Sequence, residues 1–141
     1  MIDPAMYIFI NDGLGMTKGK IAAQAAHAGV EAYRITPPDS NILRLWYKGG
    51  HYKKLVMAAR DSVHLLTIER YLNDRGFKTA LIIDEGMTEI EAHQPTALGV
   101  EVLDKNDPHV EASFCAFALL REPKPRPAPE VQSKGRWLFR R

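Results

Sequence analysis

Glycines, lysines and a glutamine gather in the stretch Gly13–Ala28, which begins shortly after the apolar run 7–10. A strand, a glycine-containing loop and a helix start commonly present backbone amides to a phosphate. Lys20 and Gln24 are four residues apart, so on a helix they lie on one face, one turn above the other. The stretch therefore indicates a phosphate cradle, a cofactor loop or a site that uses a lysine at a helix start. The alternative to all three is the solvated face of an ordinary amphipathic helix.

A nucleoside-triphosphate loop does not fit this stretch. Its pattern is Gly-x-x-x-x-Gly-Lys-Ser/Thr, in which the hydroxyl binds magnesium. Gly19 and Lys20 match the end of that pattern, but Leu14 stands where its first glycine belongs. Ile21 stands where the hydroxyl belongs, so the triphosphate interpretation fails twice.

A dinucleotide-binding loop fits only in part. Gly13 and Gly15 match the pattern Gly-x-Gly-x-x-Gly, but Lys18 stands in its third place. The next expected strand ends at Arg60 without an acid for the ribose, and it lies farther along than a compact βαβ unit of roughly 30 residues allows. An NADP-binding oxidoreductase is therefore kept as the less favoured alternative.

Asp84 directly follows the apolar run 80–83, which we expect to be a central strand. Ligands of α/β sheets bind at the carboxyl ends of strands, so this carboxylate is placed for a functional role. A cap on the turn at Gly86 explains it equally well. Thr88 and Thr96, taken alone, are ordinary residues of extended chain.

The composition bounds the class of protein. The chain has 141 residues, 45% of them hydrophobic and 26% charged, which is typical of one globular domain. No apolar run approaches the ~20 residues that cross a bilayer, and no signal-peptide pattern opens the chain. Cys115 is the only cysteine, which excludes an internal disulfide and favours the cytoplasm. The histidines lack metal-ligand spacing, so we predict no metal, and we expect His27 to be packed.

Charge is unevenly placed along the chain. Residues 121–141 hold seven basic and two acidic residues, so residues 1–120 carry a net charge of −3 out of a total of +2. A nucleic acid would therefore meet a local basic patch or the tail, since the body has no general positive field.

The residue pattern predicts one α/β domain over residues 1–120 and a proline-rich basic tail over 121–141. Strands are expected at 7–10, 54–59, 80–83 and 96–103, and helices at 17–33, about 40–48, 61–75 and from 107. Residues 114–120 fit either a helix or a strand. Alternating strands and helices favour a Rossmann-like, three-layer α/β/α sandwich with a mixed, mostly parallel sheet of about four strands.

Two segments together are similar to the type II (archaeal and eukaryotic) peptidyl-tRNA hydrolase family. They read LGMTKGKIAAQAAHA and LIIDEGMT. The family carries the signature Met-Gly-Lys-Gly-Lys-x-Ala-Ala-Gln-x-x-His-Ala and a later Asp-Ala-Gly-x-Thr. Thr17 and Glu85 depart from these signatures, and Asn11 stands where family members usually carry arginine. The similarity covers roughly residues 7–104.

The resemblance implies a set of catalytic residues, which are Lys20, Gln24, Asp84, Thr88 and Thr96. Family members hydrolyse the ester between a peptide and the 3′ ribose of its tRNA, which recycles the tRNA, and they need no cofactor. We expect Lys20 to provide positive charge for a phosphate or an oxyanion, and Gln24 to hold the ester or a water. Asp84 would orient Lys20 or accept a proton from water, and the threonines would fix Asp84 or the substrate.

The resemblance also implies partners: a peptidyl-tRNA substrate and a second copy in a homodimer, with no membrane. Lys18, Lys53 and Lys54 are the expected substrate-binding cations, the last two within a basic cluster before the second strand. Lysines that protect a solvated strand edge explain this cluster nearly as well. A catalytically inactive tRNA- or protein-binding module on the same scaffold is the main alternative function.

Overall fold

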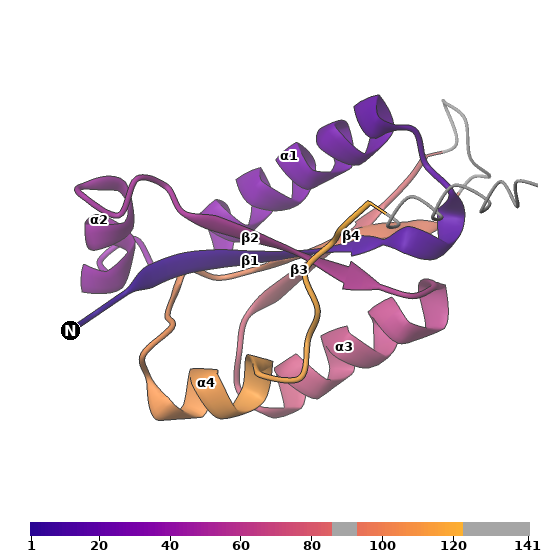
Figure 1. The fold of residues 1–141 in the computed structure, drawn as a ribbon. Coiled ribbons are helices and arrows are strands. Elements are labelled where there is room, and N and C mark those ends of the chain that lie inside the picture. The colour runs from indigo at the N-terminus through magenta and orange to yellow at the C-terminus, as the bar shows by residue number, and fades with distance from the viewer. Residues whose placement is uncertain (86–92, 123–141) are drawn as a thin grey trace, which may run out of the picture.

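The computed structural model describes residues 1–85 and 93–122, in which one sheet lies between two layers of helices (Figure 1). The elements, in chain order, are β1 (Pro4–Asn11), the 3₁₀ turn η1 (Asp12–Leu14), α1 (Lys18–Ile35), α2 (Asn41–Tyr47), β2 (Lys54–Ala59), α3 (Ser62–Asp74), β3 (Thr79–Ile83), β4 (Pro95–Val100), β5 (Leu103–Asp104) and α4 (Pro108–Phe114). The expected α/β class is confirmed. Within the described residues no helix has the length and apolarity to span a bilayer.

The sheet is mixed, with its main strands in the order β2-β1-β4-β3. β1 and β2 are parallel, whereas β4 is antiparallel to both β1 and β3, and the short β5 is antiparallel to β1. The prediction of a mostly parallel sheet is therefore wrong, and β3 is an edge strand rather than a central one. The reason is that β4 runs back between β1 and β3, so a hairpin replaces the expected crossover.

Apolar side chains on the two faces of β1 explain the three layers. All eight residues of β1 are buried, as a strand without polar alternation predicts. One face packs with α1 and α2 through a core that includes Ile8, Ala28 and Trp46. The other face packs with α3 and α4 through a core that includes Phe9 and Leu65.

Side-chain caps fix the helix starts, close to the positions where the sequence predicted helices to begin. The Thr17 hydroxyl accepts the Lys20 amide, and the Asp61 carboxylate accepts the His64 amide at the start of α3. The Ser40 hydroxyl accepts the Leu43 amide and caps α2. The start of α1 is thereby set, which places Lys20 in its first turn.

A close approach at Gly99 sets the height of α1 above the sheet. A Cβ atom at Gly99 would lie 2.3 Å from the carbonyl oxygen of Ala28 and 3.0 Å from the Cβ of Ala32. Only glycine permits this contact, and the small residues of α1 permit it from the other side. The alanine-rich helix therefore packs close to the sheet.

The segment that follows α4 pairs with the outer edge of β2. The amide of Ala58 donates to the carbonyl of Ala118 (2.9 Å), and the amide of Leu120 donates to the carbonyl of Val56 (2.9 Å). The helix ends at Phe114, residues 115–116 form a turn, and Leu119 makes an isolated antiparallel bridge with Met57, so the undecided region 114–120 is neither a continuous helix nor a regular strand. Residues 123–141 lie outside the described residues, and the boundary between a domain at 1–120 and a tail stays a prediction.

Candidate active site

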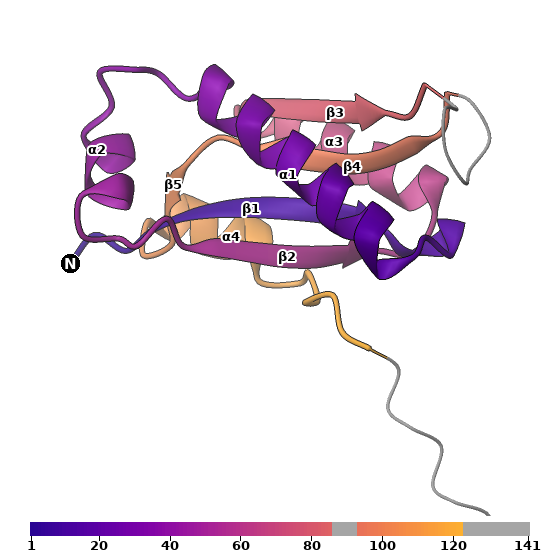
Figure 2. The same cartoon turned by 90° about the horizontal axis from the view of Figure 1, so that it is seen from above.

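Chain direction brings four strand ends to one edge of the sheet, which we call the carboxyl edge. β1, β2 and β3 all finish there, and β4 begins there because it is antiparallel to β1 and β3. The first turns of α1 lie over this edge (Figure 2). Residues distant in the sequence therefore meet, with Lys20 and Gln24 coming from α1, Asp84 from the end of β3 and Thr96 from the start of β4.

Lys20 and Asp84 form a buried ion pair. The Lys20 Nζ lies 3.1 Å from the Asp84 Oδ2, and the two side chains are only 9% and 6% exposed. The alternative that Lys20 belongs to a solvated helix face is therefore wrong. Each charge is largely removed from water, which strengthens their mutual attraction and any field they exert on a neighbouring group.

Gln24 and Thr96 form a second buried contact at the same edge. The Thr96 hydroxyl donates a hydrogen bond to Gln24 Oε1, and the Ile82 carbonyl oxygen lies 3.4 Å from the same hydroxyl. Both side chains are buried. Because the amide oxygen is occupied by Thr96, the NH₂ group of Gln24 is the end left to donate to another acceptor.

The backbone of Asp84 is held at the base of the β3–β4 connection. Its amide donates to the Gln94 carbonyl (2.9 Å), and its carbonyl accepts the His93 amide (2.6 Å). His93 has a φ of 64°, a left-handed conformation that closes this connection. Thr88 and Gly86 lie outside the described residues, so Thr88 has no position in the site and the turn-cap alternative stays untested.

Asn11 is a site-edge residue that the sequence did not single out for a role. It is buried at the end of β1, and its Nδ2 donates to the Pro95 carbonyl (2.8 Å) and the Ser62 hydroxyl (2.9 Å). Its Oδ1 accepts the Gly13 amide (3.1 Å). These bonds tie the end of β1 to the starts of β4 and α3. The one available signal was a polar residue directly after a wholly apolar strand.

The three expected substrate-binding lysines are divided between the two edges. Lys18 is exposed at the start of α1, beside a pocket that also includes Ile21 and Arg121. Lys53 and Lys54 lie at the start of β2, which pairs with β1 near Met6 and not near Asn11. At about 3.3 Å per residue they are roughly 17 Å along the strand from the carboxyl edge. Lys53 and Lys54 are therefore far from Lys20, whereas Lys18 lies at the same edge of the sheet as Lys20.

The histidines near these residues have different surroundings. His64 Nδ1 accepts the Arg60 amide (2.9 Å), and burial together with the Arg60 charge lowers the pKa of His64 below its usual value. His27 is exposed on α1, so the expectation that it packs is wrong. Among residues 1–85 and 93–122, no group of three or more His, Cys, Asp or Glu side chains is arranged to hold a metal ion.

Sequence comparison identifies the family. Residues 5–109 match the family model described as peptidyl-tRNA hydrolase PTH2. The chain belongs to this family. It is 37% identical to the peptidyl-tRNA hydrolase of Pyrobaculum aerophilum over 112 residues, which cover 74% of this chain and 92% of that protein. It is 39% identical to the protein of the same name from Methanococcus vannielii, over 66% and 80% of the two chains.

A eukaryotic relative extends the comparison. The mitochondrial peptidyl-tRNA hydrolase 2 of Mus musculus is 35% identical over 112 residues, which cover 75% of this chain and 61% of the mouse protein. The match to the PTH2 family spans β1 to the start of α4 and therefore includes Lys20, Gln24, Asp84 and Thr96. The segment that pairs with β2, around Ala118 and Leu120, lies beyond it.

Proposed function

We propose that the chain hydrolyses the ester bond between a peptide and the 3′ ribose of tRNA, as the names of its relatives state for them, and so returns tRNA to translation. The observation that carries this proposal is the buried Lys20–Asp84 pair beside the Gln24–Thr96 contact. An ester is moderately reactive, so the main tasks are to place a water molecule and to stabilise negative charge on the carbonyl oxygen.

Each residue of the pair has a proposed task. The Lys20 ammonium stabilises the developing oxyanion or the terminal phosphate, and Asp84 holds that ammonium in position. The 3.1 Å contact supports this orienting role of Asp84 over proton acceptance from water, because an ion-paired carboxylate is a weaker base. Water attacks the ester directly, the ester C–O bond breaks, and the ribose oxygen takes up a proton.

Gln24 is proposed to hold the ester carbonyl or the attacking water through its NH₂ group. Thr96 keeps the amide in that orientation, because its hydroxyl occupies the amide oxygen. Thr88 remains proposed as a hydroxyl that fixes Asp84 or the substrate, on the family resemblance alone. Lys18 is proposed to bind a phosphate near the ester, and Lys53 and Lys54 a more distant part of the tRNA.

We further propose that the protein acts in the cytoplasm as a homodimer. Both proposals rest on the family resemblance, with the lone cysteine as additional support for a reducing compartment. Light scattering of the purified chain gives its mass directly. A mass equal to one chain across the working concentration range contradicts the dimer.

The function is tested with two substrates that differ in one group. The protein is incubated with N-blocked aminoacyl-tRNA, which mimics a peptide, and with free aminoacyl-tRNA of the same tRNA. We expect rapid release of the blocked amino acid. An unchanged blocked substrate at enzyme concentrations above that of the tRNA would refute the activity and favour a binding module.

A further inference from the structure

Three neighbouring pockets that share lining residues lie along β2 beside α1, and together we call them the track. Helix α1 crosses the sheet obliquely (Figure 2) and packs mainly on β1, β4 and β3, so its side of β2 stays partly open. A pocket beside Lys18 shares Ala25 and Val56 with a second, apolar groove of about 420 Å³. That groove shares Tyr52 and Lys54 with a third pocket of about 720 Å³ at the opposite edge of the sheet.

The middle of the track is an aromatic platform, formed by Tyr33, Trp46 and Tyr52. Tyr33 and Tyr52 are about half exposed, at 50% and 55%, whereas Trp46 is buried. The ring centroids of Trp46 and Tyr52 are 5.2 Å apart in an edge-to-face arrangement, and those of Trp46 and Tyr33 are 6.5 Å apart. The Lys54 ammonium lies 5.1 Å from the Trp46 ring and 5.7 Å from the Tyr52 ring.

The turn before β2 holds Tyr52 in an unfavourable backbone conformation. His51 and Tyr52 both have a φ of 54°, in the left-handed region that residues with side chains rarely adopt. Two bonds fix the turn: the Tyr52 amide donates to the Trp46 carbonyl (3.0 Å), and Trp46 Nε1 donates to the Lys53 carbonyl (2.8 Å). Strained residues of this kind concentrate at binding sites, where the surrounding structure keeps them in place.

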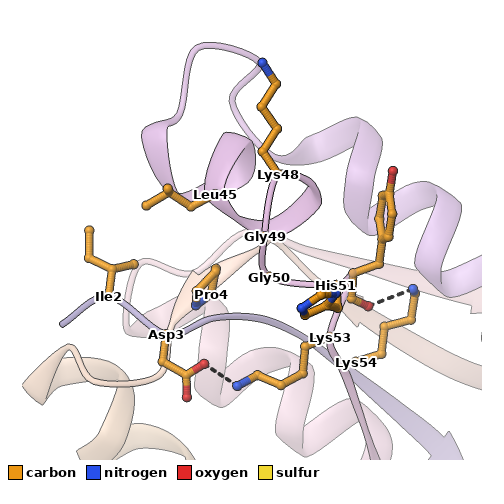
Figure 3. A pocket seen from close by; sticks show the side chains of 11 residues that line it. Ile2, Asp3, Pro4, Leu45, Lys48, Gly49, Gly50, His51, Lys53 and Lys54 are labelled. Carbon is orange, nitrogen blue, oxygen red and sulfur yellow. Dashed lines mark hydrogen bonds and ion pairs between the residues drawn. The ribbon is translucent and has the colours of Figure 1, made fainter.

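The far end of the track is basic (Figure 3). Lys48, Lys53 and Lys54 line the third pocket, together with one carboxylate, that of Asp3. Asp3 is already paired with Lys53, and Lys54 Nζ donates to the Tyr52 carbonyl (3.0 Å). The lining therefore has more positive than negative groups, next to rings that face solvent.

We propose that the aromatic platform binds unpaired nucleotides of the tRNA substrate, with bases stacked on Tyr52 and Tyr33 and phosphates beside Lys54. Exposed aromatic rings interleaved with lysines are the usual surface for single-stranded nucleic acid, since every base has a face that stacks. This inference rests on the proposed function, because it takes the substrate to be tRNA.

Two observations favour RNA over a second copy of this chain on the platform. A two-fold contact through this surface would bring the lysines of both copies together, and like charges oppose such a contact. The track also reaches Lys18, which is proposed to bind a phosphate at the carboxyl edge, although Lys20, Gln24, Asp84 and Thr96 do not line its pockets. An unpaired RNA strand, unlike a second copy of this chain, carries phosphates for the lysines at both ends of the track.

The test measures RNA binding without hydrolysis. The anisotropy of a labelled, unpaired oligonucleotide is compared with that of a duplex of equal length for the wild type, Tyr52→Ala and Tyr47→Ala. Tyr47 is the matched control, because it is 37% exposed on neighbouring α2 and lines neither the platform nor the basic pocket. Thermal melts check that each variant folds.

We expect Tyr52→Ala to weaken binding of the unpaired strand by about 5- to 100-fold, with little change for the duplex or for Tyr47→Ala. Lys54→Gln should reduce the slope of log affinity against log salt by about one. With peptidyl-tRNA, Tyr52→Ala should raise KM and leave kcat near the wild-type value.

Equal affinities of Tyr52→Ala and Tyr47→Ala for the unpaired strand would overturn the proposal. A dimer that dissociates in Tyr52→Ala, with RNA affinity unchanged, would overturn it in favour of a second copy on the platform. The proposed function would fail on a different result, in which the wild type binds the RNA but releases no blocked amino acid from tRNA. If the wild type hydrolyses the substrate and Tyr52→Ala has the same KM and the same RNA affinity, only the proposed role of the platform is refuted.

Discussion

Lysine–aspartate pairs lie at both edges of the sheet, and their surroundings differ sharply. At the carboxyl edge the Lys20 and Asp84 side chains are 9% and 6% exposed. At the opposite edge the Lys53 and Asp3 side chains are 37% and 36% exposed. The same two residue types are thus a buried pair in one place and a surface pair in the other. Burial, and not composition, separates the proposed catalytic pair from the surface one.

The two pairs also differ in what they do for the fold. A surface pair contributes at most about 1 kcal/mol, because water and salt screen it. A buried pair loses much of its attraction to desolvation and is weak evidence for stability, but removal of one partner leaves an uncompensated charge. A buried pair at the proposed reaction edge is therefore better explained by chemistry than by stability.

The largest expected effect is that of Lys20→Ala. It should reduce kcat for peptidyl-tRNA by about 10²- to 10³-fold, the loss typical of one group that stabilises an oxyanion. The matched control is Lys105→Ala at the opposite edge, where Lys105 Nζ lies 4.0 Å from Asp3. Similar rates for the two variants would contradict the assignment.

Lys20→Ala should also destabilise the protein, by about 3 kcal/mol, because it leaves Asp84 buried without its cation. The sequence pointed the other way, since it indicated an exposed lysine with little effect on stability. Chemical denaturation measures the loss. The double variant Lys20→Ala/Asp84→Asn should recover part of it without recovering activity.

Asp84→Asn should lower kcat by about 100-fold and also destabilise the protein by about 3 kcal/mol, because it leaves the Lys20 ammonium buried without its carboxylate. Asparagine keeps the shape and the backbone bonds to residues 93 and 94 but removes the charge that orients Lys20. Asp107→Ala is the contrasting variant, because Asp107 caps α4 by accepting the His109 amide. It should cost about 1 kcal/mol of stability and leave kcat intact. A purely thermal effect of Asp84→Asn would support the turn-cap explanation instead.

Gly99→Ala should destabilise the protein by about 1–3 kcal/mol, because its Cβ would meet the Ala28 carbonyl and lift α1 from the sheet. The shift should also lower kcat, since Lys20 and Gln24 move with the helix. Gly19→Ala is the control in the same helix, as nothing lies within 4 Å of its added Cβ. It should stabilise the protein by about 0.5–1 kcal/mol. Equal melting temperatures for the two variants would be evidence against close packing at Gly99.

The smallest effect concerns Asp3. A hydrogen bond from Lys53, together with the charges of Lys53 and Lys105, holds the pKa of Asp3 below its usual 3.8. Its contribution to stability is therefore present above that pH and lost as the pH falls through the lower folded value. Lys53→Met should return the pKa toward 3.8, as carboxyl NMR titration would show. An unchanged titration would mean that the pair does not persist in solution.

Local features of the fold were predictable from the sequence because they depend on adjacent residues. Helices α1 and α3 begin directly after Thr17 and Asp61, close to their expected starts, and strand 54–59 has the expected bounds. Strand order was not predictable, because it depends on long-range pairing. A run such as 80–83 has the same apolar pattern at an edge as in the centre of a sheet. The prediction that β3 is a central strand was therefore wrong.

The site, like the fold, was predictable from the sequence only where it depends on neighbouring residues. Spacing put Lys20 and Gln24 on one helix face, but only the fold brings Asp84 and Thr96 to that face. Burial of Lys20 could not be read from an alanine-rich helix, whose small residues fit a solvated stripe as well as a covered one. The family resemblance, not the spacing, connected the two segments.

A double-mutant cycle on single-turnover hydrolysis tests most directly whether Lys20 and Asp84 act as one unit. The rates of the wild type, Lys20→Ala, Asp84→Asn and the double variant are measured with saturating enzyme on N-blocked aminoacyl-tRNA. We expect the double variant to be no slower than Lys20→Ala, because the role of Asp84 is to position the ammonium. A double variant slowed by the product of the two single effects would contradict it.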